Sequence, residues 1–226
     1  MIPRKAKYAR EPNLSLGKAF SLWIREIPPL VMLVHLGAWV VFRAYLASQG
    51  DYGWWDLAPL AAVLLLHPFI EWVIHVFILH HRPRRVFGFR WDFHSARYHR
   101  LHHRDPWDLR WVVAPLSLVL VGSLFGAAIY WPLSPSTGVF ASAMIVTTGL
   151  TLFYEWIHFL IHTSYRPKGA LYRRWYRLHR LHHYKNENYW MGVTRHFGDV
   201  VLGTMPEPSS VEASKTARTL GIEVED

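Results

Sequence analysis

The run IEWVIHVFILHHRP, residues 70–83, combines two properties that rarely occur together. It is apolar enough to end a membrane helix, yet it holds a glutamate, Glu71, and spaced histidines. A second run, YEWIHFLIHTSYRP at residues 154–167, repeats the pattern with Glu155 in the place of Glu71. Polar side chains in or near hydrocarbon are costly and usually functional. The two runs therefore predict a membrane protein whose chemistry lies at the ends of its helices.

Both runs belong to long apolar stretches. Four such stretches are long enough to cross a bilayer core, for which roughly 20 residues are needed, and they run at about 28–46, 57–80, 111–131 and 139–162. The charged residues inside them are Arg43, Glu71 and Glu155. An apolar share of 51% with 12 Trp fits the same interpretation. We therefore expect four membrane-spanning helices arranged as two hairpins.

Basic residues are gathered in blocks between these stretches. Most of the 25 Lys and Arg lie within residues 1–25, 82–110 and 166–185, whereas the connections at 47–56 and 132–138 contain none. An excess of Lys and Arg marks the cytoplasmic side of a membrane protein. All three blocks are therefore expected on the cytoplasmic face. This placement accounts for the net charge of +9 without nucleic acid as a partner.

Many of the 15 histidines form four spaced clusters. The spacings are H-x4-H, H-x2-H-H, H-x3-H and H-x2-H-H, and the members are His75, His80, His99, His102, His103, His158, His162, His179, His182 and His183. Helix positions i, i+3 and i+4 share a face, so three of the clusters can direct their imidazoles to one point. His75 and His80 lie about 140° apart on an ideal helix. Their convergence requires a distortion such as a π-bulge, or the end of the helix.

These side chains indicate a metal site. Imidazole is a common neutral ligand for iron, copper and zinc, and a sequence without cysteine offers only nitrogen and oxygen ligands. Ten imidazoles exceed the coordination sphere of one ion, so two ions are expected. His35 and His67 stand alone on apolar stretches and are expected in the core. Glu71 and Glu155 are expected to orient imidazoles by hydrogen bonds rather than to bind metal.

The two halves of the chain also echo each other beyond the runs already quoted. RYHRLHH at 97–103 resembles RLHRLHH at 177–183, in the same order as 70–83 and 154–167. This repetition predicts two similar hairpins that face each other across a pseudo-two-fold axis, with one metal-binding centre between them.

At these residues the chain resembles the fatty acid hydroxylase (sterol desaturase) superfamily, and within it the catalytic domain of fatty acid 2-hydroxylases. The resemblance covers about residues 60–205. It rests on the order of the four clusters, on HRLHHRDPWDLRWVVAP at 99–115 and on the ending LHHYKNENYWMGVTRHFGDVVLGTMPE at 181–207. It implies that all ten clustered histidines are metal ligands, with no catalytic residue beyond the metal centre.

The resemblance further implies a membrane-bound dimetal hydroxylase that uses O2, with iron for turnover and with zinc able to occupy the site in a purified sample. The implied substrate is a lipid or fatty acyl chain, hydroxylated at carbon 2. Many eukaryotic relatives carry an N-terminal cytochrome b5 domain with a His-Pro-Gly-Gly motif, which this sequence lacks. A separate electron donor of the ferredoxin or cytochrome b5 type is therefore expected, and the bacterial inner membrane is favoured over the endoplasmic reticulum.

Two alternative functions stay open. The first is another oxygenase of the same superfamily, acting on a sterol, a carotenoid or a lipid head group. The second is a membrane carrier of zinc or iron. Transporters place their ligands near the bilayer midplane, whereas these clusters lie near one end of the predicted spans.

The expected fold is an all-α integral membrane protein with four transmembrane helices and cytosolic helices that carry a histidine-rich dimetal centre. Residues 1–27 are expected to form a basic N-terminal segment with an interfacial amphipathic helix, an ordinary packed helix being the alternative. Residues 28–205 are expected to form a membrane-embedded fatty acid hydroxylase domain. Residues 206–226 are expected to be a polar, loosely held tail.

Overall fold

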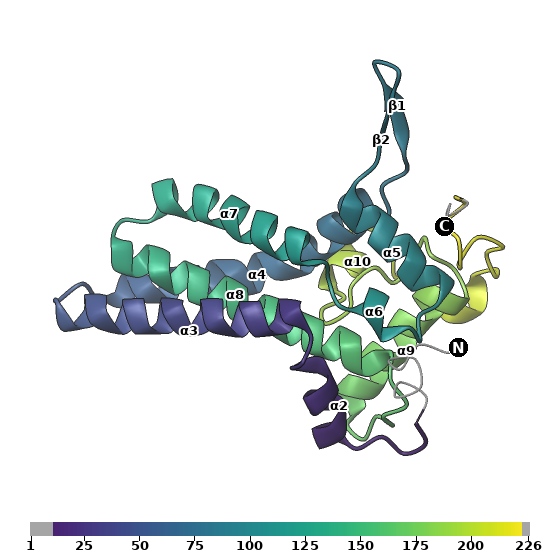
Figure 1. Ribbon diagram of the computed structural model, residues 1–226, viewed down its shortest axis with the longest axis horizontal. Coiled ribbons are helices and arrows are strands. Elements are labelled where there is room, and N and C mark those ends of the chain that lie inside the picture. The colour runs from purple at the N-terminus through teal and green to yellow at the C-terminus, as the bar shows by residue number, and fades with distance from the viewer. Residues whose placement is uncertain (1–10, 223–226) are drawn as a thin grey trace.

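The computed structural model describes residues 11–222, so the parts of the predicted terminal segments at 1–10 and 223–226 lie outside the described residues. The fold is mostly helical. Four long helices run along the long axis of the molecule (Figure 1), and these are α3 (Ile27–Ser48), α4 (Leu57–Val73), α7 (Leu116–Leu133) and α8 (Thr137–Ile161). Two further helices, α5 (His94–Arg104) and α9 (Ala170–Tyr184), lie beyond one end of this bundle.

The four expected membrane spans are present. They run over Ile27–Ser48, Trp54–Leu79, Leu109–Leu133 and Thr137–Ile161, close to the stretches predicted from hydropathy. Much of their surface faces outward, since only 6% of an apolar 18-residue stretch of the first span and 17% of such a stretch of the third are buried inside the protein. Apolar faces of this extent are stable in lipid rather than in water. The chain is therefore an integral membrane protein.

Helix α8 is the centre of the bundle and packs against α3, α4 and α7. At the end away from α5 and α9, polar contacts join the helices. Arg43 of α3 forms an ion pair with Asp56 at 2.6 Å and donates to the Ser142 hydroxyl at 3.0 Å. Asp51 accepts hydrogen bonds from the Ser136 hydroxyl and from the Gly138 amide, both at 2.7 Å. The one basic residue within the predicted spans is therefore paired.

The second span changes its helical geometry twice. Pro68 lies inside α4 and cannot donate to the carbonyl of Leu64. The guanidinium of Arg195 donates to that carbonyl instead, at 2.9 Å. After Val73 the helix widens into a π-helix, η2 (Ile74–Leu79). The π-helix ends just before His80, so both departures expected from the spacing of His75 and His80, a distortion and the end of the helix, occur here.

The third span is interrupted near its start. A short helix, α6 (Leu109–Val112), is capped by Asp108, whose carboxylate accepts from the Arg110 amide at 3.1 Å. The chain is then extended at Val113 and Pro115, and α7 begins at Leu116 rather than near residue 111. Proline disfavours helical conformation in the residue before it, which explains the break.

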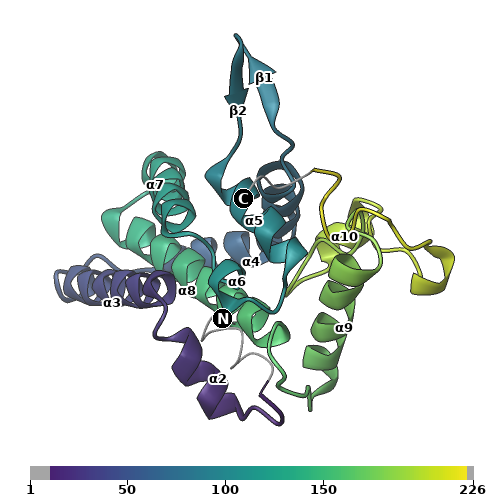
Figure 2. The ribbon, with the colours of Figure 1, turned by 45° about the vertical axis from the view of Figure 1, so that its right-hand side comes forward.

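A two-stranded hairpin was not expected in an all-α fold. Strand β1 (Arg84–Val86) pairs antiparallel with β2 (Phe89–Trp91). The two turn residues, Phe87 and Gly88, have φ of 50° and 81°. Two consecutive positive φ values are typical of the tight turns that match the twist of a β-hairpin. The hairpin projects away from the helices in both views (Figures 1 and 2).

The N-terminal helix α2 (Leu16–Trp23) begins at Ser15, whose hydroxyl accepts from the Lys18 amide at 3.2 Å. Ala19 and Trp23 are buried on one face, and the Trp23 ring contacts Trp156 of α8 at 5.3 Å between centroids. Leu16 and Phe20, which adjoin this face, are about half exposed. The helix is therefore packed on α8, and its position at a membrane interface stays a prediction.

The C-terminal segment is folded against the helices, so the expectation of a loosely held tail is wrong for residues 206–222. Val211, Ala217 and Leu220 are buried. The Ser214 amide donates to the carbonyl of Lys185 at 2.7 Å. Between these buried residues, the Thr216 hydroxyl donates to the Glu187 carboxylate at 2.5 Å, so polar contacts also hold the segment in place.

Candidate metal centre

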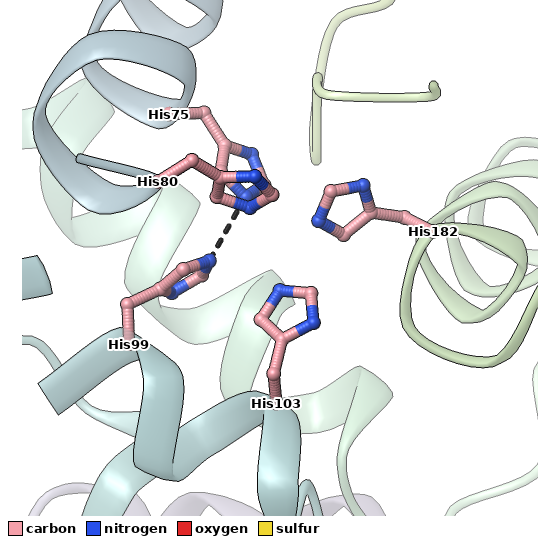
Figure 3. A group of neighbouring side chains, drawn as sticks. All are labelled: His75, His80, His99, His103 and His182. Carbon is pink, nitrogen blue, oxygen red and sulfur yellow. Dashed lines mark hydrogen bonds between the residues drawn. The ribbon is translucent and has the colours of Figure 1, made fainter. Parts of the chain in front are cut away.

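The structure brings all ten clustered histidines together in two adjoining groups. The first group comprises His75, His80, His99, His103 and His182, and the second comprises His102, His158, His162, His179 and His183. Within each group the five ring nitrogens that could bind an ion lie within 4.8 Å of one another. All ten side chains are buried except that of His80, which is partly buried. Figure 3 shows the rings of the first group converging from three separate segments of the chain.

The groups do not follow the order of the sequence. The first group takes four histidines from the first half of the chain and one, His182, from α9. The second group takes four from the second half and one, His102, from α5. Each H-x2-H-H cluster therefore gives its middle histidine to the opposite group. This exchange is consistent with two halves related by a pseudo-two-fold axis.

The convergent ring nitrogens fit metal ions. In the first group the Nε2 atoms of His75 and His99 lie 3.1 Å apart. In the second group Nε2 of His179 lies 3.0 Å from Nε2 of both His162 and His183. Several other ring nitrogens are buried without a hydrogen-bond partner, namely Nε2 of His80, His103, His158 and His182. Buried polar atoms without partners are costly, and an ion bound between them removes that cost.

Backbone carbonyls orient many of these rings from behind. The Nδ1 atoms of His75, His103 and His182 bond to the carbonyls of Met191 (2.5 Å), Ala217 (2.9 Å) and Tyr189 (2.8 Å). His158 and His162 bond to the carbonyls of Val112 and Pro106. A ring that donates through Nδ1 presents Nε2 as the metal-binding atom, so these bonds fix both the tautomer and the direction of the ring.

The expectation that Glu71 and Glu155 hydrogen-bond to imidazole ligands is wrong. The carboxylate of Glu71 accepts from the Val193, Thr194 and Arg195 amides at 3.2–3.3 Å. The carboxylate of Glu155 accepts from the Ala114 amide at 3.1 Å. Three amides converge on Glu71 where the loop turns around its carboxylate, whereas a single amide bonds to Glu155.

Each glutamate nevertheless acts on a ligand through a loop. Glu71 holds residues 193–195, and the same loop supplies the Met191 carbonyl to His75. Glu155 holds Ala114, and the same break in the third span supplies the Val112 carbonyl to His158. The same arrangement of carboxylate, loop amide, loop carbonyl and imidazole therefore occurs once at each of the two histidine groups.

Asp199 also stabilises the loop that contains Met191 and residues 193–195. Its carboxylate accepts from the Met191 amide at 2.7 Å and from the Gly192 amide at 2.8 Å, and the side chain is fully buried. A Cβ atom on Gly192 would lie 2.3 Å from the Arg195 carbonyl oxygen. The loop therefore requires glycine at this position.

Replacing Glu71 with alanine is expected to weaken metal binding at the first group by about 10–100-fold, the range typical of residues that orient ligands. The loss leaves the Val193, Thr194 and Arg195 amides without this acceptor and frees the Met191 carbonyl from its position. Metal analysis should find one retained ion in both E71A and E71A/H75A. E71Q keeps an acceptor oxygen and should restore binding in part.

The matched control is Glu155→Ala, which should empty the second group instead. E71A/E155A should then lose both ions. Full retention of both ions by E71A would contradict the role given to the loop.

The imidazoles of the ligand histidines outside the membrane spans are held neutral by their surroundings. Burial is the main cause, and neighbouring imidazoles add to it, so the pKa values of His99, His102, His179 and His183 lie well below the ordinary histidine value. Burial lowers the pKa of His103 to about 3. Neutral imidazole is the form that binds metal, so the site presents its ligands in the binding form at neutral pH.

The metal-free protein should lose stability as the pH falls below about 6.5. In the unfolded chain these histidines take up protons near that pH, whereas in the folded chain they take them up only well below it. The unfolded state then binds more protons, so the free energy of unfolding decreases from about pH 6.5 downward and is unaffected by these groups at higher pH. Thermal unfolding of chelator-treated protein in detergent should therefore begin at lower temperature near pH 5 than near pH 7.5. Equal unfolding temperatures at both values would contradict this expectation.

The remaining histidines lie outside the two groups. His35 has a hydrogen-bond partner as expected, since its Nε2 accepts from the Trp39 indole at 2.8 Å, but it is partly buried rather than in the core. His67 is buried beside Glu71, with 3.4 Å between its Nδ1 and the carboxylate. His94 is exposed and bonds to the Ser117 hydroxyl. His196 is buried, and its Nε2 has no hydrogen-bond partner.

Comparison with known proteins identifies the class to which this site belongs. The fatty acid hydroxylase family model matches residues 60–204. The chain belongs to the fatty acid hydroxylase family. It is accordingly an integral membrane enzyme with a histidine-rich site of the dimetal kind.

Individual relatives are more distant. The chain is 26% identical over 157 residues to the dihydroceramide fatty acyl 2-hydroxylase FAH1 of Arabidopsis thaliana, covering 67% of this chain and 62% of the relative. It is 24% identical over 143 residues to FAH2 of the same plant, covering 61% and 56%. The chain therefore spans about six tenths of the length of these relatives. The structure of full-length Scs7p, in which only the hydroxylase domain is visible, matches with a TM-score of 0.61 at 21% identity, covering 89% of this chain and 70% of that one. At this identity the likeness shows the fold alone.

Proposed function

We propose that this chain is an O2-dependent lipid hydroxylase that places a hydroxyl group on carbon 2 of a long acyl chain, with two metal ions bound by the ten histidines. The observation that carries the proposal is the pair of buried five-histidine groups at one end of four membrane spans. Nitrogen ligands without thiolate suit iron that activates O2. We propose iron as the metal of turnover, with zinc as an ion that replaces it during purification.

The reaction needs a balanced supply of electrons. One oxygen atom of O2 enters a C–H bond and the other becomes water, which consumes two electrons and two protons. Bound iron would supply the oxygen activation. The chain itself holds the ions through oriented imidazoles and keeps bulk water away, since nearly all the ligands are buried. The electrons come from a separate donor of the ferredoxin or cytochrome b5 type.

The position on the acyl chain is proposed from two considerations. Both curated relatives named above are dihydroceramide fatty acyl 2-hydroxylases by name. In addition, the histidine groups lie beside the ends of the spans rather than near their middle. Carbons close to a lipid head group reach this depth more readily than the end of the tail does. The basic blocks on the same side support a site on the cytoplasmic face, and we propose the cytoplasmic side of a bacterial inner membrane as its location.

A groove beside the membrane helices is a suitable surface for the acyl chain. Its volume is about 570 Å³, and its apolar wall includes Leu64, Leu65, Phe153 and Trp175. This volume is in the range of about 300–1,000 Å³ found for small-molecule sites. Thr194, Arg195 and His196 form its polar part. The unpartnered Nε2 of His196 and the remaining N–H donors of Arg195 are suited to the oxygen atoms of a lipid head group.

Product analysis tests the proposed function. Purified protein with ferrous iron, a reductase system, ¹⁸O2 and membrane lipid should yield a lipid with one labelled oxygen, and fragmentation should place it on carbon 2. H158A, which lacks a ligand of the second group, is the negative control. Oxygen found on a sterol ring, a carotenoid ring or a head group would refute the acyl assignment. Metal transport without lipid-dependent O2 consumption would refute the enzyme class.

Filling the groove should impair turnover without removing metal. Leu65→Trp is expected to lower kcat/KM by about 10-fold, because a large ring occupies space proposed for the chain, a loss equivalent to about 1.4 kcal/mol. Leu124→Trp on α7 is the matched control, since Leu65 and Leu124 are 67% and 72% exposed. Equal kinetics of the two variants would exclude the groove as the acyl surface, while metal analysis verifies that both keep their ions.

A further inference from the structure

The β-hairpin at 84–91 exposes an unusual set of side chains. Phe87 is 96% exposed, Phe89 79% and Trp91 57%, and Arg84, Arg85 and Arg90 stand among them. Large aromatic side chains that project together into water are unfavourable, and such patches mark sites of interaction. The hairpin lies on the side of the bundle where α5 and α9 hold the histidine groups (Figure 1).

The strand register separates these side chains onto two faces. Arg84 pairs with Trp91 and Val86 pairs with Phe89, so these residues share one face. Arg85 pairs directly with Arg90 on the other face. Directly opposite strand residues point to the same side of a sheet. The hairpin therefore has one mainly apolar, aromatic face and one cationic face.

The base of the hairpin is fixed to the metal-binding helix. Arg100 of α5 is only 3% exposed, forms an ion pair with Asp92 and donates to the His81 carbonyl at 3.1 Å. Phe93 packs on His81 with 4.6 Å between ring centroids. Both ends of the hairpin are therefore attached to the same helix, and the strands extend from a rigid support.

The direction of the hairpin fits a membrane surface. It follows the second span, which ends at Leu79. It extends across the direction of the four long helices rather than along them (Figures 1 and 2). With the spans upright in a bilayer, the strands would lie along the interface at the level where the spans end. Aromatic rings and arginines are the side chains favoured at that level.

We propose that the hairpin is a membrane-interface anchor that inserts its aromatic face at the boundary of the acyl chains and contacts anionic lipid phosphates through its arginines. Continuity with the second span and the matching charge favour lipid over a soluble protein as the partner. The hairpin joins His80 to α5, so its depth sets the height of the first histidine group above the membrane core. The proposal does not depend on which lipid is hydroxylated.

Site-directed labelling tests the anchor, and the sequence suits it because it contains no cysteine. Phe89→Cys carries an environment-sensitive fluorophore on the aromatic face, and Ser209→Cys, an exposed position of the C-terminal segment, is the matched control. Full-length protein is placed in nanodiscs of phosphatidylcholine with or without phosphatidylglycerol. The F89C label should emit at shorter wavelength and be quenched several-fold more strongly than the S209C label by lipids with a nitroxide near the head group.

Charge reversal tests the cationic face separately. R85E/R90E should reduce quenching of the F89C label in the discs with phosphatidylglycerol and have little effect in pure phosphatidylcholine. An F89C label that stays in water in both kinds of disc would overturn the proposal. If that label instead responded only to an added electron-donor protein, the hairpin would be a protein-docking site. None of these measurements uses hydroxylase activity, so a failure of the proposed function would leave their outcome unchanged.

Discussion

Replacing His182 with alanine is expected to remove the ion of the first group and to lower hydroxylase activity by more than 100-fold, a larger loss than the 10–100-fold typical of residues that only orient ligands. The neighbours of His182 in the sequence, His179 and His183, belong to the second group. The ring of His182 lies 4.6 Å from that of His75 instead. Its loss should therefore affect the group built mainly from the first half of the chain.

Double variants identify which ion is lost. H75A/H182A removes two ligands of one group and should retain one ion, whereas H179A/H182A removes one ligand from each group and should retain none. His102→Ala provides the reciprocal test: H102A/H158A should keep one ion and H99A/H102A should keep none. If H179A/H182A kept one ion and H75A/H182A kept none, the grouping by sequence neighbours would be correct and the exchange would be wrong.

Removing residues 206–226 is expected to weaken metal binding at the first group by about 10–100-fold and activity at least as much. The deletion removes the Ala217 carbonyl, which orients His103 at 2.9 Å. It also uncovers the surface buried by Val211 and Leu220. Metal titration with increasing chelator concentration measures the affinity of the two groups in turn.

Two further variants distinguish the loss of the tail's contacts from the mere loss of chain length as the cause of weaker metal binding. Truncation after residue 222 keeps every contact described for the tail and should behave as the full chain. V211D/L220D keeps the length but places carboxylates at two buried positions, which should detach the segment and reproduce the deletion. Unchanged chelator resistance in the deletion would show that His103 needs no support from the tail.

The parts of this protein that could be predicted are those that depend on local sequence. Four apolar stretches predict four spans because the bilayer requires a minimum length. Three of the four histidine clusters have helical spacings and predict convergent imidazoles, because spacing fixes the face of a helix. The five-residue separation of His75 and His80 predicts either a distortion such as a π-bulge or the end of the helix, and the structure has a π-helix that ends just before His80.

The parts that could not be predicted depend on how distant segments meet. His102 of α5 and His182 of α9 each belong to the opposite group. This exchange depends on how the two helices face each other, which the sequence of either helix alone does not determine. The carbonyls of Met191 and Ala217 orient ligands, but any residue has a carbonyl, so sequence gives no signal for them. Glu71 was recognised as polar in an apolar span, while its backbone partners lie more than a hundred residues away.

The π-helix has a consequence for how this span tolerates changes in length. The first histidine pair is spaced H-x4-H and the corresponding pair in the second half is spaced H-x3-H, so the two differ by one residue. Ile74–Leu79 takes up that residue as a π-turn, while the equivalent part of α8 stays an ordinary α-helix. A π-turn is what an α-helix becomes when it accommodates a single insertion. Deleting one residue between His75 and His80 would return the turn to α-helix and leave the helix before it in place. This short segment is therefore where the second span can differ by one residue from its counterpart in the second half while both histidines stay directed at the same point.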